Sequence, residues 1–250
     1  MIKLTAAVKE HRFINITIVF VIAGIIAAGA FSWTGKAKRP QVSAIAATSK
    51  IPGVDVLGVE NTSLGSSQIL VVRLQNNSGK AIKALTIRTG KTWVTKNYLL
   101  IEESFATGTV LNQTIPPFSE SQVDGREITL AAVLFADGTA EGDSHYAQML
   151  LDQRAGMRDQ ARRIIKTLRA LSGSSESDQE KSMESCEAEI LRMPLKRDGA
   201  SADYEEGLLN SQKWLLNHIS EIKAQRRSNH LAEAQAKQEK LTRVFESLIN

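Results

Sequence analysis

The chain has 250 residues, enough for one or two domains with a buried core, and carries a net charge of +4. Its basic character is concentrated in residues 1–50, which hold seven Lys or Arg side chains and one Glu. This distribution argues against a nucleic-acid-binding protein, in which basic side chains spread over a folded domain. The single cysteine, Cys186, excludes a disulfide within the chain and a zinc site of the Cys-rich type.

A long apolar segment follows a short basic tail at residues 1–13. Residues 14–31 carry no charge over eighteen positions, about 27 Å as a helix, and Trp33 follows where an indole suits the headgroup region. We therefore expect a transmembrane anchor at 14–33 in contact with the lipid bilayer. A cleaved signal peptide is the alternative, because residues 28–30 fit a cleavage site. The order of basic tail, apolar core and small residues predicts a single-pass protein whose C-terminal bulk is periplasmic or extracellular.

Residues 34–53 are small, basic and interrupted by Pro and Gly, which indicates a linker. From Val54 the composition changes to short runs rich in β-branched and aromatic residues, divided by turn residues. Such runs at near-regular spacing predict an antiparallel β-sandwich domain over residues 54–143. Its expected strands cover 54–60, 68–75, 81–89, 92–101, 109–115 and 126–135.

The segments VVRLQNNSGKAIKALTI and AAVLFADGTAEGD, followed by a helical region with QRAGM, resemble uncharacterised bacterial membrane-anchored proteins. In that group an immunoglobulin-like or fibronectin-like sandwich is followed by helices. The similarity covers about residues 54–171. It implies a fold and a location, and it implies neither an activity nor catalytic residues.

The segment FADGTAEGD ends the last expected strand and contains three acidic side chains that could ligate calcium, which prefers several oxygen ligands: Asp137, Glu141 and Asp143. A full EF-hand loop needs more ligands and a terminal Glu at its twelfth position, and this segment lacks both. We interpret the segment as a structural corner, with a turn at 137–138, a bend at Gly142, and Asp143 or Ser144 as a helix N-cap. The calcium site remains the alternative.

From Ser144 onward the apolar residues recur three or four positions apart, which predicts a helical tail or hairpin over residues 144–250. The expected helices cover 144–171 and 178–193, with a third from about Tyr204 that could bend at the polar stretch 225–230. Their apolar stripes fit an intramolecular core. Self-association through these C-terminal helices, as a coiled coil, is the alternative.

Two charged ridges lie on the expected helices. The basic ridge on the first helix has cationic side chains four positions apart: Arg154, Arg158, Arg162 and Lys166. The acidic ridge on the second helix consists of Glu180, Glu184 and Glu187. We expect the two ridges to face each other across an antiparallel hairpin. The alternative is that the basic ridge recruits an anionic lipid headgroup or an acidic partner.

The sequence contains no recognisable catalytic motif, neither a G-x-S-x-G elbow, nor an H-E-x-x-H pair, nor a phosphate-binding glycine loop. Cys186 lies near several glutamates and is expected to be an inert thiol. The predicted fold class is α+β: an N-terminal transmembrane helix, an antiparallel sandwich and a C-terminal helical tail or hairpin. We expect a membrane-tethered interaction or scaffold protein without catalytic activity or cofactor, bound to a protein that the sequence does not identify. A small-ligand or calcium sensor using the 137–143 corner is the alternative function.

Overall fold

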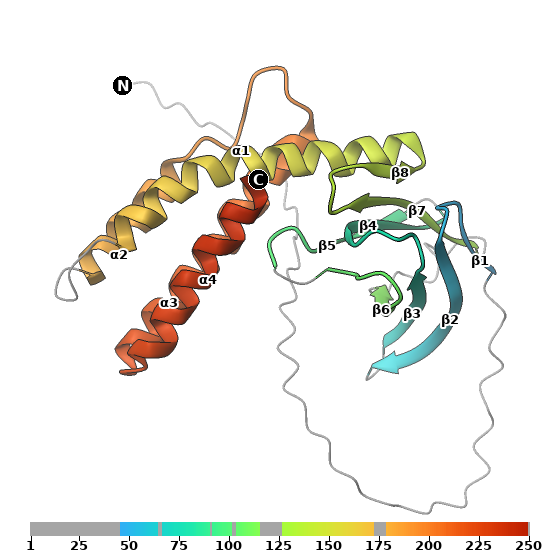
Figure 1. Ribbon diagram of the computed structural model, residues 1–250, viewed down its shortest axis with the longest axis horizontal. Coiled ribbons are helices and arrows are strands. Elements are labelled where there is room, and N and C mark those ends of the chain that lie inside the picture. Colours follow the sequence, from blue (N-terminus) through green and yellow to red (C-terminus); the bar gives the residue numbers. More distant parts are fainter. Residues whose placement is uncertain are drawn as a thin grey trace, which may run out of the picture. The chain divides into compact units, whose positions relative to one another are not determined.

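The computed structural model describes residues 46–64, 67–90, 92–101, 104–115, 127–172 and 179–249. These residues form two β-sheets and four helices (Figure 1). The predicted anchor at 14–33 and the basic tail lie outside the described residues, as do residues 34–45 of the predicted linker. Among the helices of the described part, none has the length and apolar character needed to cross a bilayer.

The larger sheet has five strands, four of them in the order β1 (Ala46–Ser49), β7 (Glu127–Phe135), β4 (Ile82–Thr89) and β5 (Thr92–Asn97). A short strand, β8 (Ala140–Gly142), also pairs with β7. β1 runs parallel to β7, whereas the other pairs are antiparallel. Every residue of β7 after the first is buried, as expected for an apolar run covered on both faces of a sheet.

The smaller sheet has the order β2 (Val54–Leu64), β3 (Ser67–Asn76) and β6 (Val110–Ile115), and all its pairs are antiparallel. Apolar side chains of both sheets form one core, in which Leu74 of β3 and Ile87 of β4 are fully buried. Burying one such side chain contributes about 1.5–3 kcal/mol to stability. The two sheets are therefore held together mainly by this shared apolar core.

The helices are α1 (Ser144–Ser172), α2 (Gln179–Arg192), α3 (Ala202–Arg227) and α4 (Leu231–Ile249). α1 contacts β7, β8 and each of the other three helices. The apolar face predicted for α1 is buried from Leu150 to Leu171. A second core joins the helices to the larger sheet, because Ala132 and Leu134 of β7 belong to it. Neighbouring β7 residues Val133 and Phe135 point instead into the core between the sheets.

The predicted fold class is wrong. The described chain is a mixed α/β fold with four helices and two sheets, where the sequence predicted an antiparallel sandwich followed by a tail or hairpin. One reason is β1, a parallel strand within the predicted linker, whose small residues Ala46–Ser49 show no apolar alternation. The other reason is that the helices share a core with β7, so they are not a tail.

The predicted third helix is two helices, because the chain turns between Arg227 and Leu231. Asn229 adopts a left-handed conformation with φ of 62°. Its N–H donates to the carbonyl of Arg226 at 2.9 Å, and the N–H of His230 donates to Gln225 at 2.9 Å. These two bonds form a Schellman motif with Asn at the left-handed position. The polar stretch 225–230 is thus a helix end followed by a reversal, and the apolar stripes of α3 and α4 lie in the shared core.

Candidate anion-binding site

The acidic corner at 135–143 is the hairpin that joins β7 to β8. Asp137 Oδ1 accepts hydrogen bonds from the Thr139 N–H at 2.9 Å and from the Thr139 hydroxyl at 2.6 Å. Its other oxygen lies 2.7 Å from the Lys80 Nζ. These bonds, above all the one from Lys80, hold the pKa of the Asp137 carboxyl well below its usual range. Asp137 is therefore a charged carboxylate whose oxygens are engaged by the turn and by Lys80.

The other two acidic residues of the corner have separate positions. Asp143 is the N-cap of α1, since its Oδ1 accepts from the His145 N–H at 3.0 Å, as predicted. Glu141 lies on β8 opposite Val133. Within the described ranges, no three His, Cys, Asp or Glu side chains are grouped so that they could share a metal ion. The predicted role of Asp143 as a helix N-cap is confirmed. Calcium binding by the three carboxylates stays a prediction.

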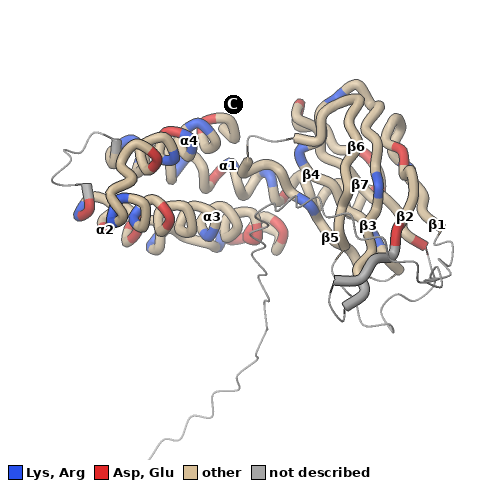
Figure 2. The backbone as a smooth tube through the Cα atoms, turned by 90° about the horizontal axis from the view of Figure 1, so that it is seen from below, with Lys and Arg blue, Asp and Glu red and all other residues tan. Residues whose placement is uncertain are grey.

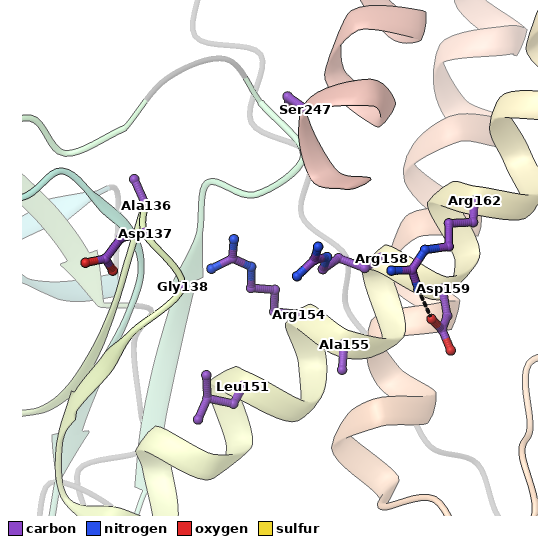
Figure 3. A pocket seen from close by; sticks show the side chains of 10 residues that line it. All are labelled: Ala136, Asp137, Gly138, Leu151, Arg154, Ala155, Arg158, Asp159, Arg162 and Ser247. Atoms are coloured by element: carbon purple, nitrogen blue, oxygen red, sulfur yellow. Dashed lines mark hydrogen bonds and ion pairs between the residues drawn. The ribbon is translucent and has the colours of Figure 1, made fainter. Parts of the chain in front are cut away.

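A cleft of about 600 Å³ lies between this hairpin turn, α1 and the end of α4 (Figure 3). We call it the arginine cleft. Three of its side chains come from the basic ridge of α1, one turn apart. Its lining residues are Ala136, Asp137, Gly138, Leu151, Arg154, Ala155, Arg158, Asp159, Arg162 and Ser247.

Arg154 lies against the turn of the hairpin. A Cβ atom on Gly138 would lie 2.8 Å from the Arg154 Nη1, and Gly138 has a φ of 89°, so both space and backbone favour glycine there. Nη1 of Arg154 is buried and has no hydrogen-bond partner among the described residues. Burial, and then repulsion by Arg158, lowers the pKa of the Arg154 guanidinium from its usual value. The surroundings of Arg154 therefore disfavour the charged form of its guanidinium.

Arg158 lies beside Arg154 in the cleft (Figure 3). Its Nη2 donates to the carbonyl of Ile249 at 2.9 Å, at the C-terminal end of α4, where helix dipoles favour a cation. Its Nε is buried, and no hydrogen-bond partner for it occurs in the described part of the chain. Arg154 and Arg158 therefore present two N–H donors with no protein acceptor within the described residues.

Arg162 differs from these two because it has an acidic partner. Its Nη1 donates to Asp159 Oδ1 at 2.6 Å. The other oxygen of Asp159 accepts from the Tyr204 hydroxyl at 2.5 Å and from Arg197 at 3.2 Å. Asp159 therefore pairs with two guanidiniums at the far end of the arginine cleft, whereas Arg154 and Arg158 form no ion pair with an acidic side chain of the described residues.

The prediction that the two charged ridges face each other is wrong. Glu187 of the acidic ridge pairs with Lys223 of α3 at 2.8 Å, and Glu180 pairs with Arg227 of α3 at 3.3 Å. The basic ridge lies against the hairpin turn and the end of α4. α1 and α2 do contact each other, but the acidic ridge is directed at α3.

Cys186 is the other reactive group that the sequence singled out. It is 3% exposed on α2, and burial, together with Glu189 and Glu187, raises the pKa of its thiol to about 12. A thiolate is the reactive form of cysteine, so burial and the raised pKa support the prediction of an inert thiol.

Comparison with known protein families, curated proteins and solved structures gives no match to this chain. The resemblance to bacterial membrane-anchored proteins therefore stays a prediction.

The three carboxylates chosen as candidate metal ligands include one residue of the arginine cleft, Asp137. The four-residue spacing of the arginines was visible in the sequence. The residues that complete the cleft were missed, namely Gly138 of the hairpin turn and Ser247 near the end of α4. The sequence marks Gly138 only as part of a turn and does not mark Ser247, because both reach the arginines only through tertiary packing.

Proposed function

We propose that this protein is a membrane-tethered interaction or scaffold protein without catalytic activity, and that its arginine cleft holds an anionic group of the partner. In this proposal residues 14–33 anchor the chain and the described residues lie outside the cytoplasm. The observation that carries the binding role is the pair Arg154 and Arg158, whose buried Nη1 and Nε have no acceptor in the described chain.

The arrangement of charge supports a local site over a general basic surface. Figure 2 shows Lys and Arg interspersed with Asp and Glu along all four helices. Mixed charges of this kind do not favour a nucleic acid, whose phosphates call for an extended basic face. Inside the arginine cleft, in contrast, Asp137 is engaged by Lys80 and Asp159 by Arg162. The two remaining guanidiniums favour an anion, because a buried charge is stabilised by a hydrogen-bonded partner of opposite sign.

Site-directed photo-cross-linking in intact membranes tests the proposed function. A photoreactive side chain at Ala155, which is exposed and lines the arginine cleft, should give a discrete adduct with the partner. The same probe at Lys213, exposed on α3 away from the cleft lining, is the matched control. Replacing Arg154 and Arg158 by Gln in the Ala155-probe chain should abolish the adduct. An adduct that persists in that variant, or the absence of any adduct at position 155, would refute the binding role.

The proposed membrane anchor at residues 14–33 is tested in the same membranes. The full chain should resist extraction by a high-salt alkaline wash, and deletion of residues 1–35 should release it. Release of the intact chain by the wash, or of a chain that begins at Phe31, would show that 14–33 is not an uncleaved anchor.

A further inference from the structure

We infer that the anionic group held in the arginine cleft is a phosphate monoester. This inference rests on the proposed function and specifies the ligand chemistry of the same site. It starts from Arg154 and Arg158, the two arginines of the cleft that form no ion pair with an acidic side chain of the described residues.

The charge of the cleft fits a dianion. Arg162 and Arg197 share Asp159, at 2.6 and 3.2 Å, and Asp137 pairs with Lys80 at 2.7 Å. Arg158 donates to a neutral acceptor, the Ile249 carbonyl, so its charge remains. At least two positive charges are thus left to be compensated, those of Arg154 and Arg158. A phosphate monoester carries about −1.5 to −2 charges near pH 7, whereas a single carboxylate carries one.

The donor geometry fits a tetrahedral group. Arg154 and Arg158 both line the cleft, so their N–H groups belong to two different guanidinium planes. Figure 3 shows the two side chains reaching side by side into the space near the hairpin turn. A single carboxylate is best held by one guanidinium, whose two parallel N–H groups match its planar oxygens. A phosphate offers oxygens in several directions and can accept from two guanidiniums at once.

The size of the cleft leaves room for more than the phosphate itself. Its volume of about 600 Å³ lies within the range of small-molecule sites. Leu151 and Ala155 line it beside the arginines, so a short apolar or glycerol-like group could lie next to them. A soluble glycerol phosphate and the headgroup of phosphatidic acid share this chemistry, with a phosphate monoester on a three-carbon unit.

The test is a titration of the full chain in zwitterionic detergent micelles, followed by calorimetry at constant ionic strength. Glycerol 3-phosphate should bind, and succinate, a flexible dicarboxylate of about the same charge, should bind at least about tenfold more weakly. Arg154→Gln and Arg158→Gln should each weaken glycerol 3-phosphate binding at least about tenfold, the loss expected for one charge-assisted hydrogen bond. Lys166→Gln, which changes the next residue of the basic ridge outside the cleft lining, should leave binding unchanged.

The outcomes separate this inference from the proposed function. Equal or tighter binding of succinate would overturn the phosphate inference and leave the anion-binding role intact. Binding of neither anion would overturn both, as would binding that Arg154→Gln and Arg158→Gln leave unchanged. Phosphatidic acid added to the micelles should compete with glycerol 3-phosphate if the source is a lipid headgroup and should not compete if the source is soluble. Either result supports a phosphate monoester.

Discussion

Gly156 of α1 and Gly207 of α3 lie so close to each other's helix that neither position has room for a Cβ atom. A Cβ on Gly156 would overlap the carbonyl oxygen of Tyr204, and a Cβ on Gly207 would overlap the carbonyl oxygen of Gln153. Both obstacles are backbone atoms, which cannot move aside as a flexible side chain can. α1 and α3 therefore pack against each other at a point that has room only for glycine.

Gly156→Ala should lower the free energy of unfolding by about 1–3 kcal/mol, the usual cost of overpacking a tight contact. The intrinsic preference of a helix for Ala over Gly acts in the opposite direction by about 1 kcal/mol. Urea denaturation followed by tryptophan fluorescence measures the difference. Gly58→Ala on β2, where a Cβ would meet no atom within 4 Å, is the control and should change little. A more stable Gly156→Ala protein would show that α1 and α3 do not approach this closely.

Asp143→Ala should lower stability by about 0.5–2 kcal/mol, because the His145 N–H at the start of α1 would lose its acceptor. Asp143→Asn should retain most of the stability, since an amide oxygen can also cap a helix. Thermal unfolding of the three proteins measures the effect. Equal losses in both variants would indicate that Asp143 acts through its charge, not through the capping bond.

The same residues allow the calcium alternative to be tested. Glu141→Ala should hardly change the thermal midpoint, in calcium or in chelator. A midpoint that rises with calcium in the wild type, and no longer rises in Glu141→Ala, would establish the metal site in place of the structural corner.

The parts of the fold that the sequence predicted correctly are those with strong local patterns. Within the apolar run 126–135, residues 127–135 form the buried strand β7, and the three-to-four spacing from Leu150 to Leu171 is the buried face of α1. The Asp143 cap was visible because a capping residue bonds only to its immediate neighbours. In each case the information lies within a few residues of the element that it specifies.

The features of the fold that the sequence did not predict depend on contacts between residues far apart in the chain. Ala46–Ser49 has no apolar alternation, and it becomes a strand because β7, about eighty residues away, offers a parallel edge. The four-residue spacing of the arginines was visible. The surroundings of these arginines could not be predicted, because Arg158 bonds to Ile249, 91 positions away in the sequence, and Arg154 lies against a hairpin turn. The sequence therefore predicted the basic ridge correctly but paired it with the acidic ridge of α2, whereas it lies against the hairpin turn and the end of α4.

The pairing of α2 with α3 predicts a specific charge rescue. Glu187→Lys should destabilise the protein by about 0–1 kcal/mol, because the new cation would face Lys223. Adding Lys223→Glu should restore stability, and adding reversals of Arg158 and Arg162 should not. A double-mutant cycle in urea at low and high salt measures the coupling, which salt should reduce. Rescue by the α1 reversals would mean that the acidic ridge faces α1 after all.

Cys186 should be protected from thiol reagents in the folded protein. Its thiol has a pKa of about 12 in the fold, against 9.0 for an exposed thiol, so the folded state holds the proton more tightly than the unfolded state. The corresponding stability is fully present below about pH 9 and is lost as the pH rises toward about 12. Alkylation at pH 8 should be slow in buffer and fast in urea. Rapid alkylation of the folded chain would contradict the burial of this side chain.

The stability of the ligand-free protein is the most direct test of whether Arg154 is held for binding. Its Nη1 is buried against Gly138 without a hydrogen-bond partner in the described chain, and Arg158 repels it, so its charge should be a cost to the empty fold. Arg154→Met keeps an unbranched apolar side chain at this position and removes the charge. In phosphate-free buffer we predict that this variant unfolds at a higher urea concentration than the wild type. Glycerol 3-phosphate should reverse the order by stabilising the wild type alone. A variant that is less stable without ligand, and a wild type that glycerol 3-phosphate does not stabilise, would show that Arg154 is an ordinary structural arginine.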